Sequence, residues 1–174
     1  VEFSRPHRVA LAAKRGERLG PMAALAVNGG EKFADDPVVT DEHGTITYGD
    51  FDKQSNSLAN ALLAKGVARG SVIWVIARDH RGLLITMAAA GKAGLRLVMM
   101  NTGFGATQFV EVAEREKLSA ILYDEEFATL ADALPEHLPR VLTWVDGDAP
   151  EGVLTLDAIA ATGDTCVNTR RLSQ

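Results

Sequence analysis

The sequence predicts an α/β domain: a parallel βαβ sheet with helices on both faces, preceded by a helix and a β-hairpin. Three observations support this fold class. Continuous apolar runs, such as residues 71–77 (SVIWVIA), are typical of strands buried on both faces. Stretches of helical periodicity separate these runs. The links between them are short, and such alternation favours a parallel sheet.

Composition limits the class of protein. A chain of 174 residues fits one domain or one large lobe, and 47% apolar with 24% charged residues is typical of a globular domain. The net charge of −5 argues against a nucleic-acid partner. The single cysteine, Cys166, excludes an internal disulfide, and no signal-peptide pattern opens the sequence. We therefore expect a cytoplasmic protein.

The chain divides into three segments. Residues 1–17 are basic and mixed, and we expect them to be loose. Residues 18–145 hold the α/β lobe. Residues 146–174 are expected to form a loop, a short apolar segment and a disordered tail, because their composition loosens and periodicity is lost.

The first part of the lobe is predicted from turn and cap residues. Pro21 suits the first turn of a helix that would stop at Gly29 and Gly30. Residues 37–48 read as a hairpin of two β-branched runs. Thr47, with Asp50 three residues later, resembles a capping box that begins the next helix.

The second part of the lobe alternates between strands and helices. Apolar runs predict the strands, and apolar residues recurring every three or four positions predict the helices. The elements are, in order, strand 71–77, helix 81–94, strand 95–100, helix 106–117, strand 119–123, helix 125–134 and strand 140–145.

The pair Gly91-Lys92 raises the question of a phosphate-binding loop. Such a loop needs a strand, a glycine-rich turn and then a helix, whose N-terminus faces the phosphate. Gly91-Lys92 instead lies near the end of a predicted helix and before a strand. Gly94 is the expected helix stop, and Lys92 would complement the negative end of the helix dipole.

Two predicted loops follow the carboxyl ends of strands, where open parallel sheets bind ligands. The candidate ligand-contacting residues are Asp79, His80, Asn101, Thr102, Gly103 and Phe104. The residues of each loop can also be explained by a purely structural role. Asp79 suits the N-cap of helix 81–94, and Gly103 and Gly105 suit a plain turn into the next helix.

No complete catalytic or metal-binding constellation stands out, so we assign no catalytic, cofactor or metal residues. There is no nucleophile elbow of the form Gly-x-Ser-x-Gly. The acidic run 124–127 is best explained as a helix start, and residues 146–148 lack the spacing of a calcium loop. Trp74 and Trp144 fall within strands, which favours core packing.

Two motifs resemble a known family. Residues 46–51 (ITYGDF) match its first core motif, and Lys92-Ala93-Gly94 leading to Asn101 matches its second. The link G-V-x-x-G-x-V lies at residues 66–72. Over roughly residues 18–145 the chain is similar to the N-terminal part of the adenylate-forming (AMP-binding) acyl-CoA synthetases. The stretch TGFG after Asn101 is similar to bacterial fatty-acid–CoA ligases of the mycobacterial kind.

The resemblance implies an incomplete N-terminal lobe of the acyl-CoA synthetase fold. The parent would use ATP with Mg²⁺ to convert a fatty acid to an acyl-adenylate, and coenzyme A would then form the thioester. The family's phosphate loop, which ends in Pro-Lys-Gly, is missing here, so we expect no cofactor in this chain and no activity from it alone. Its partner would be the missing C-terminal part of the parent.

The sequence also departs from the family pattern. Asn101 is followed by Thr102 where proline is common, and Gln108 stands near the usual place of a glutamate. Two alternatives therefore stay open. One is a non-catalytic module that forms a homodimer through an exposed sheet face. The other is a self-sufficient nucleotide-binding domain with its site at residues 101–107. The parent could also lie peripherally on a membrane.

Overall fold

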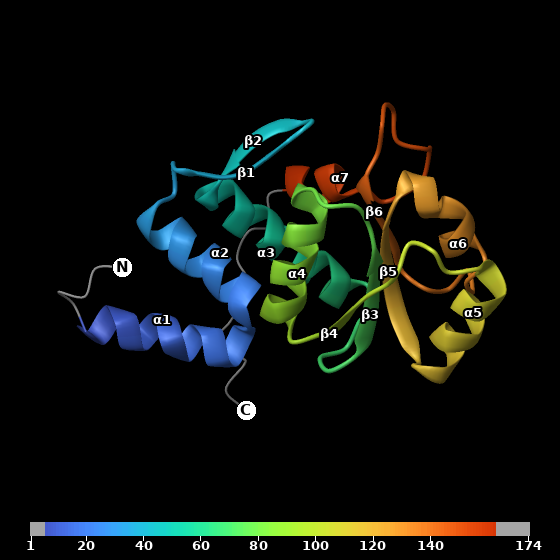
Figure 1. Ribbon diagram of the computed structural model, residues 1–174, viewed down its shortest axis with the longest axis horizontal. Coiled ribbons are helices and arrows are strands. Elements are labelled where there is room, and N and C mark those ends of the chain that lie inside the picture. The colour runs from blue at the N-terminus through green and yellow to red at the C-terminus, as the bar shows by residue number, and fades with distance from the viewer. Residues whose placement is uncertain (1–5, 163–174) are drawn as a thin grey trace.

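A computed structural model of the chain describes residues 6–162 (Figure 1). The tail from Gly163 onward, for which we expected disorder, lies outside the described residues. The elements are α1 (Pro6–Leu19), α2 (Pro21–Lys32), β1 (Pro37–Asp41), β2 (Gly44–Thr47), α3 (Tyr48–Ala64), β3 (Val72–Ile76), α4 (Arg81–Ala93), β4 (Arg96–Met99), α5 (Ala106–Arg115), β5 (Leu118–Asp124), η1 (Glu125–Phe127), α6 (Ala128–Asp132), β6 (Arg140–Trp144) and α7 (Leu156–Ala161).

The predicted parallel sheet is confirmed. Its four strands lie in the order β4-β3-β5-β6, and every neighbouring pair is parallel. Trp74 of β3 is in register with Val98 of β4 and Ile121 of β5. The carboxyl ends of all four strands therefore meet at one edge. The hairpin β1-β2 is a separate antiparallel pair, as the sequence predicts.

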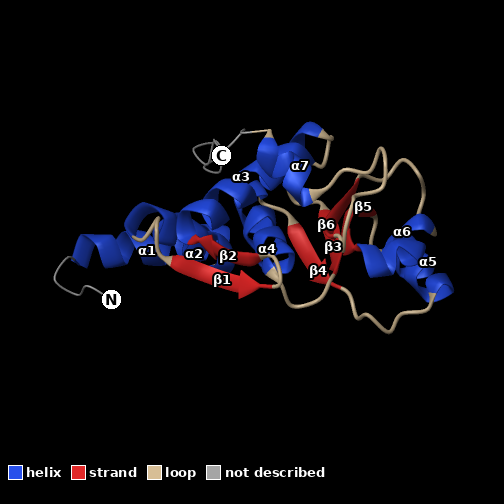
Figure 2. Ribbon diagram, turned by 90° about the horizontal axis from the view of Figure 1, so that it is seen from above, coloured by secondary structure: helices blue, strands red, loops and turns tan. Residues whose placement is uncertain are grey.

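Helices cover both faces of the sheet (Figures 1 and 2). Alternation along β3 divides the core in two, because successive side chains of a strand point to opposite faces. Ile73 and Val75 join a cluster with residues of α2, α3, α4 and α7. Val72, Trp74 and Ile76 join a second cluster with residues of α5 and α6. All five residues of β3 are buried, which explains its unbroken apolar sequence.

The N-terminal segment differs from our expectation. Instead of a loose stretch over residues 1–17, the chain forms α1 from Pro6. Tertiary contacts hold this helix to α2. The Arg15 guanidinium donates to Asn28 Oδ1 at 2.8 Å and to both carboxylate oxygens of Glu31 at 2.6 and 2.7 Å. Leu19 is buried at the junction.

Helix α2 does not stop at its two glycines. Pro21 is in the first turn as predicted, but the helix continues through Gly29 and Gly30 to Lys32. Gly29 faces the ring of Tyr48, where an added Cβ would lie 2.1 Å from ring carbon Cδ1. These glycines thus allow α2 and α3 to approach closely, and they do not end the helix.

Several local predictions are confirmed. Thr47 and Asp50 form the reciprocal capping box of α3. Gly94 ends α4 in the left-handed conformation. The predicted helix 125–134 is shorter and divided into η1 and α6, while the short apolar segment after residue 146 contains α7. Among the described residues, no helix combines the length and apolarity needed to cross a membrane.

Candidate functional site

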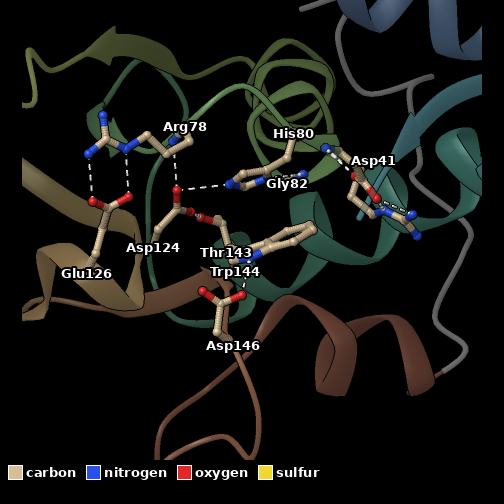
Figure 3. Close-up of polar contacts among 10 residues, drawn as sticks. Asp41, Arg78, His80, Gly82, Asp124, Glu126, Thr143, Trp144 and Asp146 are labelled. Atoms are coloured by element: carbon tan, nitrogen blue, oxygen red, sulfur yellow. Dashed lines mark hydrogen bonds and ion pairs between the residues drawn. The ribbon is translucent and has the colours of Figure 1, made fainter. Parts of the chain in front are cut away.

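Polar side chains meet at the carboxyl edge of the sheet (Figure 3). Asp124 lies at the end of β5 and is 3% exposed. One of its oxygens, Oδ2, accepts from the Arg78 backbone N–H at 2.7 Å and contacts His80 Nε2 at 2.9 Å. The other, Oδ1, accepts from the Thr143 hydroxyl at 2.7 Å. This cluster therefore ties together the ends of β3, β5 and β6.

His80 is the N-cap of α4, so the assignment of that cap to Asp79 is wrong. The N–H of Gly82 donates to His80 Nδ1 at 3.0 Å. With Nδ1 accepting, the neutral ring carries its proton on Nε2 and donates it to Asp124. Asp79 is exposed. Both nitrogens of His80 are engaged within the protein, so the ring has no free nitrogen to act as a general base on a ligand.

Sequence reasoning missed Asp124. The acidic run 124–127 was predicted as an exposed helix start, whereas the first of its residues is buried. Glu125 and Glu126 match that description, since both are exposed in the first turn of η1. Glu126 pairs on the surface with Arg78 at 2.7 Å, and this hydrogen-bonded pair lowers the pKa of Glu126. The sequence does contain a signal for Asp124. This residue comes at the end of an apolar strand, which is the same kind of position that made Asp79 and His80 candidate site residues.

Trp144 belongs to this edge and not to the core. It is only partly buried. Its indole stacks on His43 with ring centroids 3.8 Å apart and also contacts His80 at 4.4 Å. The indole N–H donates to Asp146 Oδ1 at 3.0 Å. Trp74, by contrast, is fully buried in the core, as predicted, and its ring packs edge-on against Phe109.

An ion pair fastens the hairpin to the same edge. The guanidinium Nε of Arg81, at the start of α4, donates to Asp41 Oδ2 at 2.8 Å. The Arg81 backbone N–H donates to the same carboxylate at 3.0 Å, and its side chain reaches the Gly44 carbonyl at 2.7 Å. The hydrogen bond from Arg81 lowers the pKa of Asp41 to about 2.

The second predicted loop is separate from this cluster. Asn101 Oδ1 accepts from the Gly103 N–H at 2.8 Å, which makes a local turn. Thr102 and Gly103 are exposed, while the ring of Phe104 lies 6.2 Å from that of Phe109. Within residues 6–162, no recorded hydrogen bond or ring contact joins the loop to His80. Both predicted loops lie at the carboxyl edge of the sheet, but their candidate residues do not come together in one site.

The side chains of the cluster hold backbone groups in place, as the hydrogen bonds to the N–H groups of Arg78, Arg81 and Gly82 show. A crevice of about 300 Å³ beside the cluster is lined in part by His43, Arg81, Trp144 and Asp157. Arg81 is already paired with Asp41, and His43 with Trp144. No group of three or more metal-ligating side chains occurs in the described part of the chain. The cluster therefore fixes the turn between β3 and α4 and the place of the hairpin.

Comparison with known proteins identifies the family. The AMP-binding enzyme family matches residues 27–168. The chain is 25% identical over 147 residues to the mitochondrial medium-chain acyl-CoA ligase ACSF2 of Pongo abelii, covering 74% of this chain and 24% of that protein. It is 26% identical over 151 residues to 3-hydroxybenzoate–CoA ligase of Aromatoleum sp., covering 86% and 28%.

A solved structure shows the same fold. The benzoate CoA ligase from Burkholderia xenovorans LB400 superposes with a TM-score of 0.70 at 17% identity, over 82% of this chain and 28% of that one. The chain thus spans about a quarter of the length of these relatives. Since the family match covers most of the chain, from α2 through the whole parallel sheet, the chain belongs to the AMP-binding enzyme family.

Proposed function

We propose that this chain is the N-terminal part of an acid–CoA ligase that activates a fatty acid. The observation that carries the proposal is the family match over residues 27–168. In the proposed reaction, the carboxylate attacks the α-phosphorus of ATP, giving an acyl-adenylate and pyrophosphate. The thiol of coenzyme A then displaces AMP to give the thioester.

The described residues do not fit ATP with Mg²⁺. His80, Asp124 and Arg81 are engaged by partners within the protein, and no group of three metal-ligating side chains is present in residues 6–162. The printed sequence also has no Ser/Thr- and Gly-rich loop ending in Pro-Lys-Gly. We therefore assign binding of ATP, Mg²⁺ and coenzyme A to the rest of the parent, and to this chain a scaffold role. We place the parent in the cytoplasm or peripherally on a membrane.

The proposal also specifies the class of acid that the parent enzyme activates. Support for a fatty acid comes from the Thr102–Gly105 stretch, which is similar to mycobacterial-type ligases, and from a medium-chain ligase among the relatives. A relative named for 3-hydroxybenzoate marks an aromatic acid as the competing substrate class.

The test is an assay of the whole gene product with ATP, Mg²⁺, coenzyme A and one acid at a time: decanoate, palmitate, benzoate or 3-hydroxybenzoate. Pyrophosphate release and the mass of the acyl-CoA product are measured. We expect thioester from a fatty acid, and none from residues 1–174 alone. Thioester from the aromatic acids only would overturn the fatty-acid assignment, and activity of the isolated 174-residue chain would overturn the scaffold role.

A further inference from the structure

Helix α1 packs on α2 at one end of the molecule (Figure 1). Beside this contact lies a groove of about 600 Å³, which we call the α1 groove. Its lining comes from residues of α1 between 11 and 19, from Val27 and Glu31 of α2 and from Asp52 and Asn56 of α3. This volume is typical of sites for small molecules. The family match begins at residue 27, so the α1 wall of the groove lies outside it.

Part of the α1 groove is apolar. Leu11, Leu19 and Val27 all line it. Leu19 is buried and Val27 is half-buried, but Leu11 is 49% exposed although it is a large apolar side chain. Because removing apolar surface from water is favourable, a ligand with an apolar part would be stabilised by covering these three side chains.

Two cations of the same groove have no partner within the protein. Lys14 and Arg18 line the groove and are exposed, and within residues 6–162 neither makes a hydrogen bond or an ion pair. The two residues are four positions apart on α1, so their side chains are neighbours on one side of the helix. A single anionic group can therefore contact both.

The carboxylates on the opposite wall are already neutralised. Arg15 donates to both carboxylate oxygens of Glu31 at 2.6 and 2.7 Å, and the buried Lys92 donates to Asp52 Oδ1 at 2.7 Å. Glu17 is the remaining carboxylate of the lining, and it makes no ion pair among the described residues. The groove thus keeps an excess of positive charge, although the net charge of the chain is −5.

We infer that the α1 groove binds a fatty-acid anion, with its carboxylate between Lys14 and Arg18 and its acyl chain along Leu11, Leu19 and Val27. This inference rests on the proposed function, since a fatty acid is the substrate proposed there. Charge and shape favour this occupant. A single-chain carboxylate has one anionic and one apolar part, as the lining requires. A concave groove encloses one molecule, whereas a bilayer presents a flat surface.

Titration of the 174-residue chain with dodecanoate, followed by amide chemical shifts in NMR, provides the first test. We expect saturable shifts that gather in residues 11–19 and around Val27. Acetate lacks the acyl chain and dodecyltrimethylammonium has the opposite charge, so neither should produce these shifts at the same concentration. The absence of saturable shifts with dodecanoate would overturn the inference, and so would equal shifts with acetate.

Matched substitutions provide the second test. We expect Lys14→Gln combined with Arg18→Gln to weaken dodecanoate binding about tenfold, and Glu17→Gln to strengthen it about threefold, because each charge acts at an exposed position. Lys53→Gln, at an exposed cation of α3 outside the lining, should leave the affinity unchanged. Equal melting temperatures confirm that the variants are folded. Unchanged affinity in the double variant, or an equal loss with Lys53→Gln, would contradict the site.

The outcomes separate this inference from the proposed function. Dodecanoate binding in the α1 groove, together with a whole gene product that has no ligase activity, would overturn the function alone. Ligase activity on fatty acids, without dodecanoate binding in the groove, would overturn this inference alone. If phosphatidylglycerol vesicles bind through Lys14 and Arg18 while monomeric dodecanoate does not, the occupant is a membrane surface and the inference is wrong.

Discussion

At the scale of single residues, Asp124 carries the largest number of buried polar contacts in the edge cluster. It accepts from Arg78, His80 and Thr143. We expect Asp124→Ala to lower the free energy of unfolding by about 3 kcal/mol, because three donors lose their acceptor in a buried place. Urea unfolding measures the change. Asp148→Ala, at an exposed acidic residue, is the control, and an equal effect of both substitutions would contradict the role of the cluster.

Lys92 is the second residue whose role only the structure reveals. The sequence predicted that it would complement the end of α4, but it is fully buried. Its ammonium donates to Asp52 Oδ1 at 2.7 Å, to the Asp52 carbonyl at 3.0 Å and to the Ser55 hydroxyl at 2.7 Å. Burial lowers the pKa of Lys92, and this outweighs the opposing attraction of Asp52.

The lowered pKa gives a pH-dependent prediction. Between the native pKa of Lys92 and 10.5, the unfolded chain binds more protons than the folded one, so stability rises with pH. Lys92→Met should abolish this rise and lower the free energy of unfolding at neutral pH by about 3 kcal/mol, because Asp52 and Ser55 lose their donor. Urea unfolding at a series of pH values below 10 tests this. Burial raises the pKa of Tyr123 in both proteins, so its contribution cancels. An identical pH slope in both proteins would contradict the prediction.

At the scale of elements, Gly91 explains the Gly-Lys pair that resembles a phosphate loop. An added Cβ at Gly91 would lie 2.2 Å from the Leu19 carbonyl oxygen, where α1 meets α2. We expect Gly91→Ala to cost about 2 kcal/mol, despite the higher helix propensity of alanine, because backbone must move. Gly16→Ala in α1, with nothing within 4 Å of the added Cβ, should stabilise slightly. The melting temperatures of the two variants test this. Stabilisation by both substitutions would exclude the close approach of α4 to the junction of α1 and α2.

The hairpin β1-β2 should be sensitive to acid. The pKa of Asp41 is lowered from 3.8 to about 2 by Arg81, so the pair stabilises the fold above pH 4 and this contribution is lost as the pH falls through 2. We expect Arg81→Ala to remove about 1–2 kcal/mol of stability at neutral pH and to flatten the profile between pH 4 and 2. Arg115→Ala, at an exposed ion pair, is the control. A wild-type acid profile in Arg81→Ala would contradict this.

At the scale of the whole molecule, one sheet serves two cores. Side chains of β3 alternate between the cluster with α2, α3, α4 and α7 and the cluster with α5 and α6. Because each core needs the same strands, we expect residues 6–162 to unfold in one cooperative transition. Ile73→Ala and Phe109→Ala, one in each core, should lower the midpoint of a single transition. Two separate transitions by circular dichroism and tryptophan fluorescence would contradict this.

Patterns that depend on neighbouring residues were readable from the sequence. The capping box of Thr47 and Asp50 and the left-handed Gly94 arise from interactions within a few positions. The apolar run of β3 is continuous in the sequence, so its burial on both faces could be predicted without knowing its partners. Their order along the chain was enough to predict a parallel sheet with helices on both faces. The motifs around Tyr48 and Lys92 were enough to indicate the family that the AMP-binding match then showed.

Only the tertiary structure decided what depends on distant contacts. Whether Asp124 is an exposed helix start or a buried acceptor depends on His80, 44 residues away. Whether Lys92 meets solvent or Asp52 depends on how α4 packs on α3. The sequence by itself determined the fold class and the family, because local periodicity and short motifs encode them. The structure decided which polar residues are buried and partnered, because burial depends on which elements pack together.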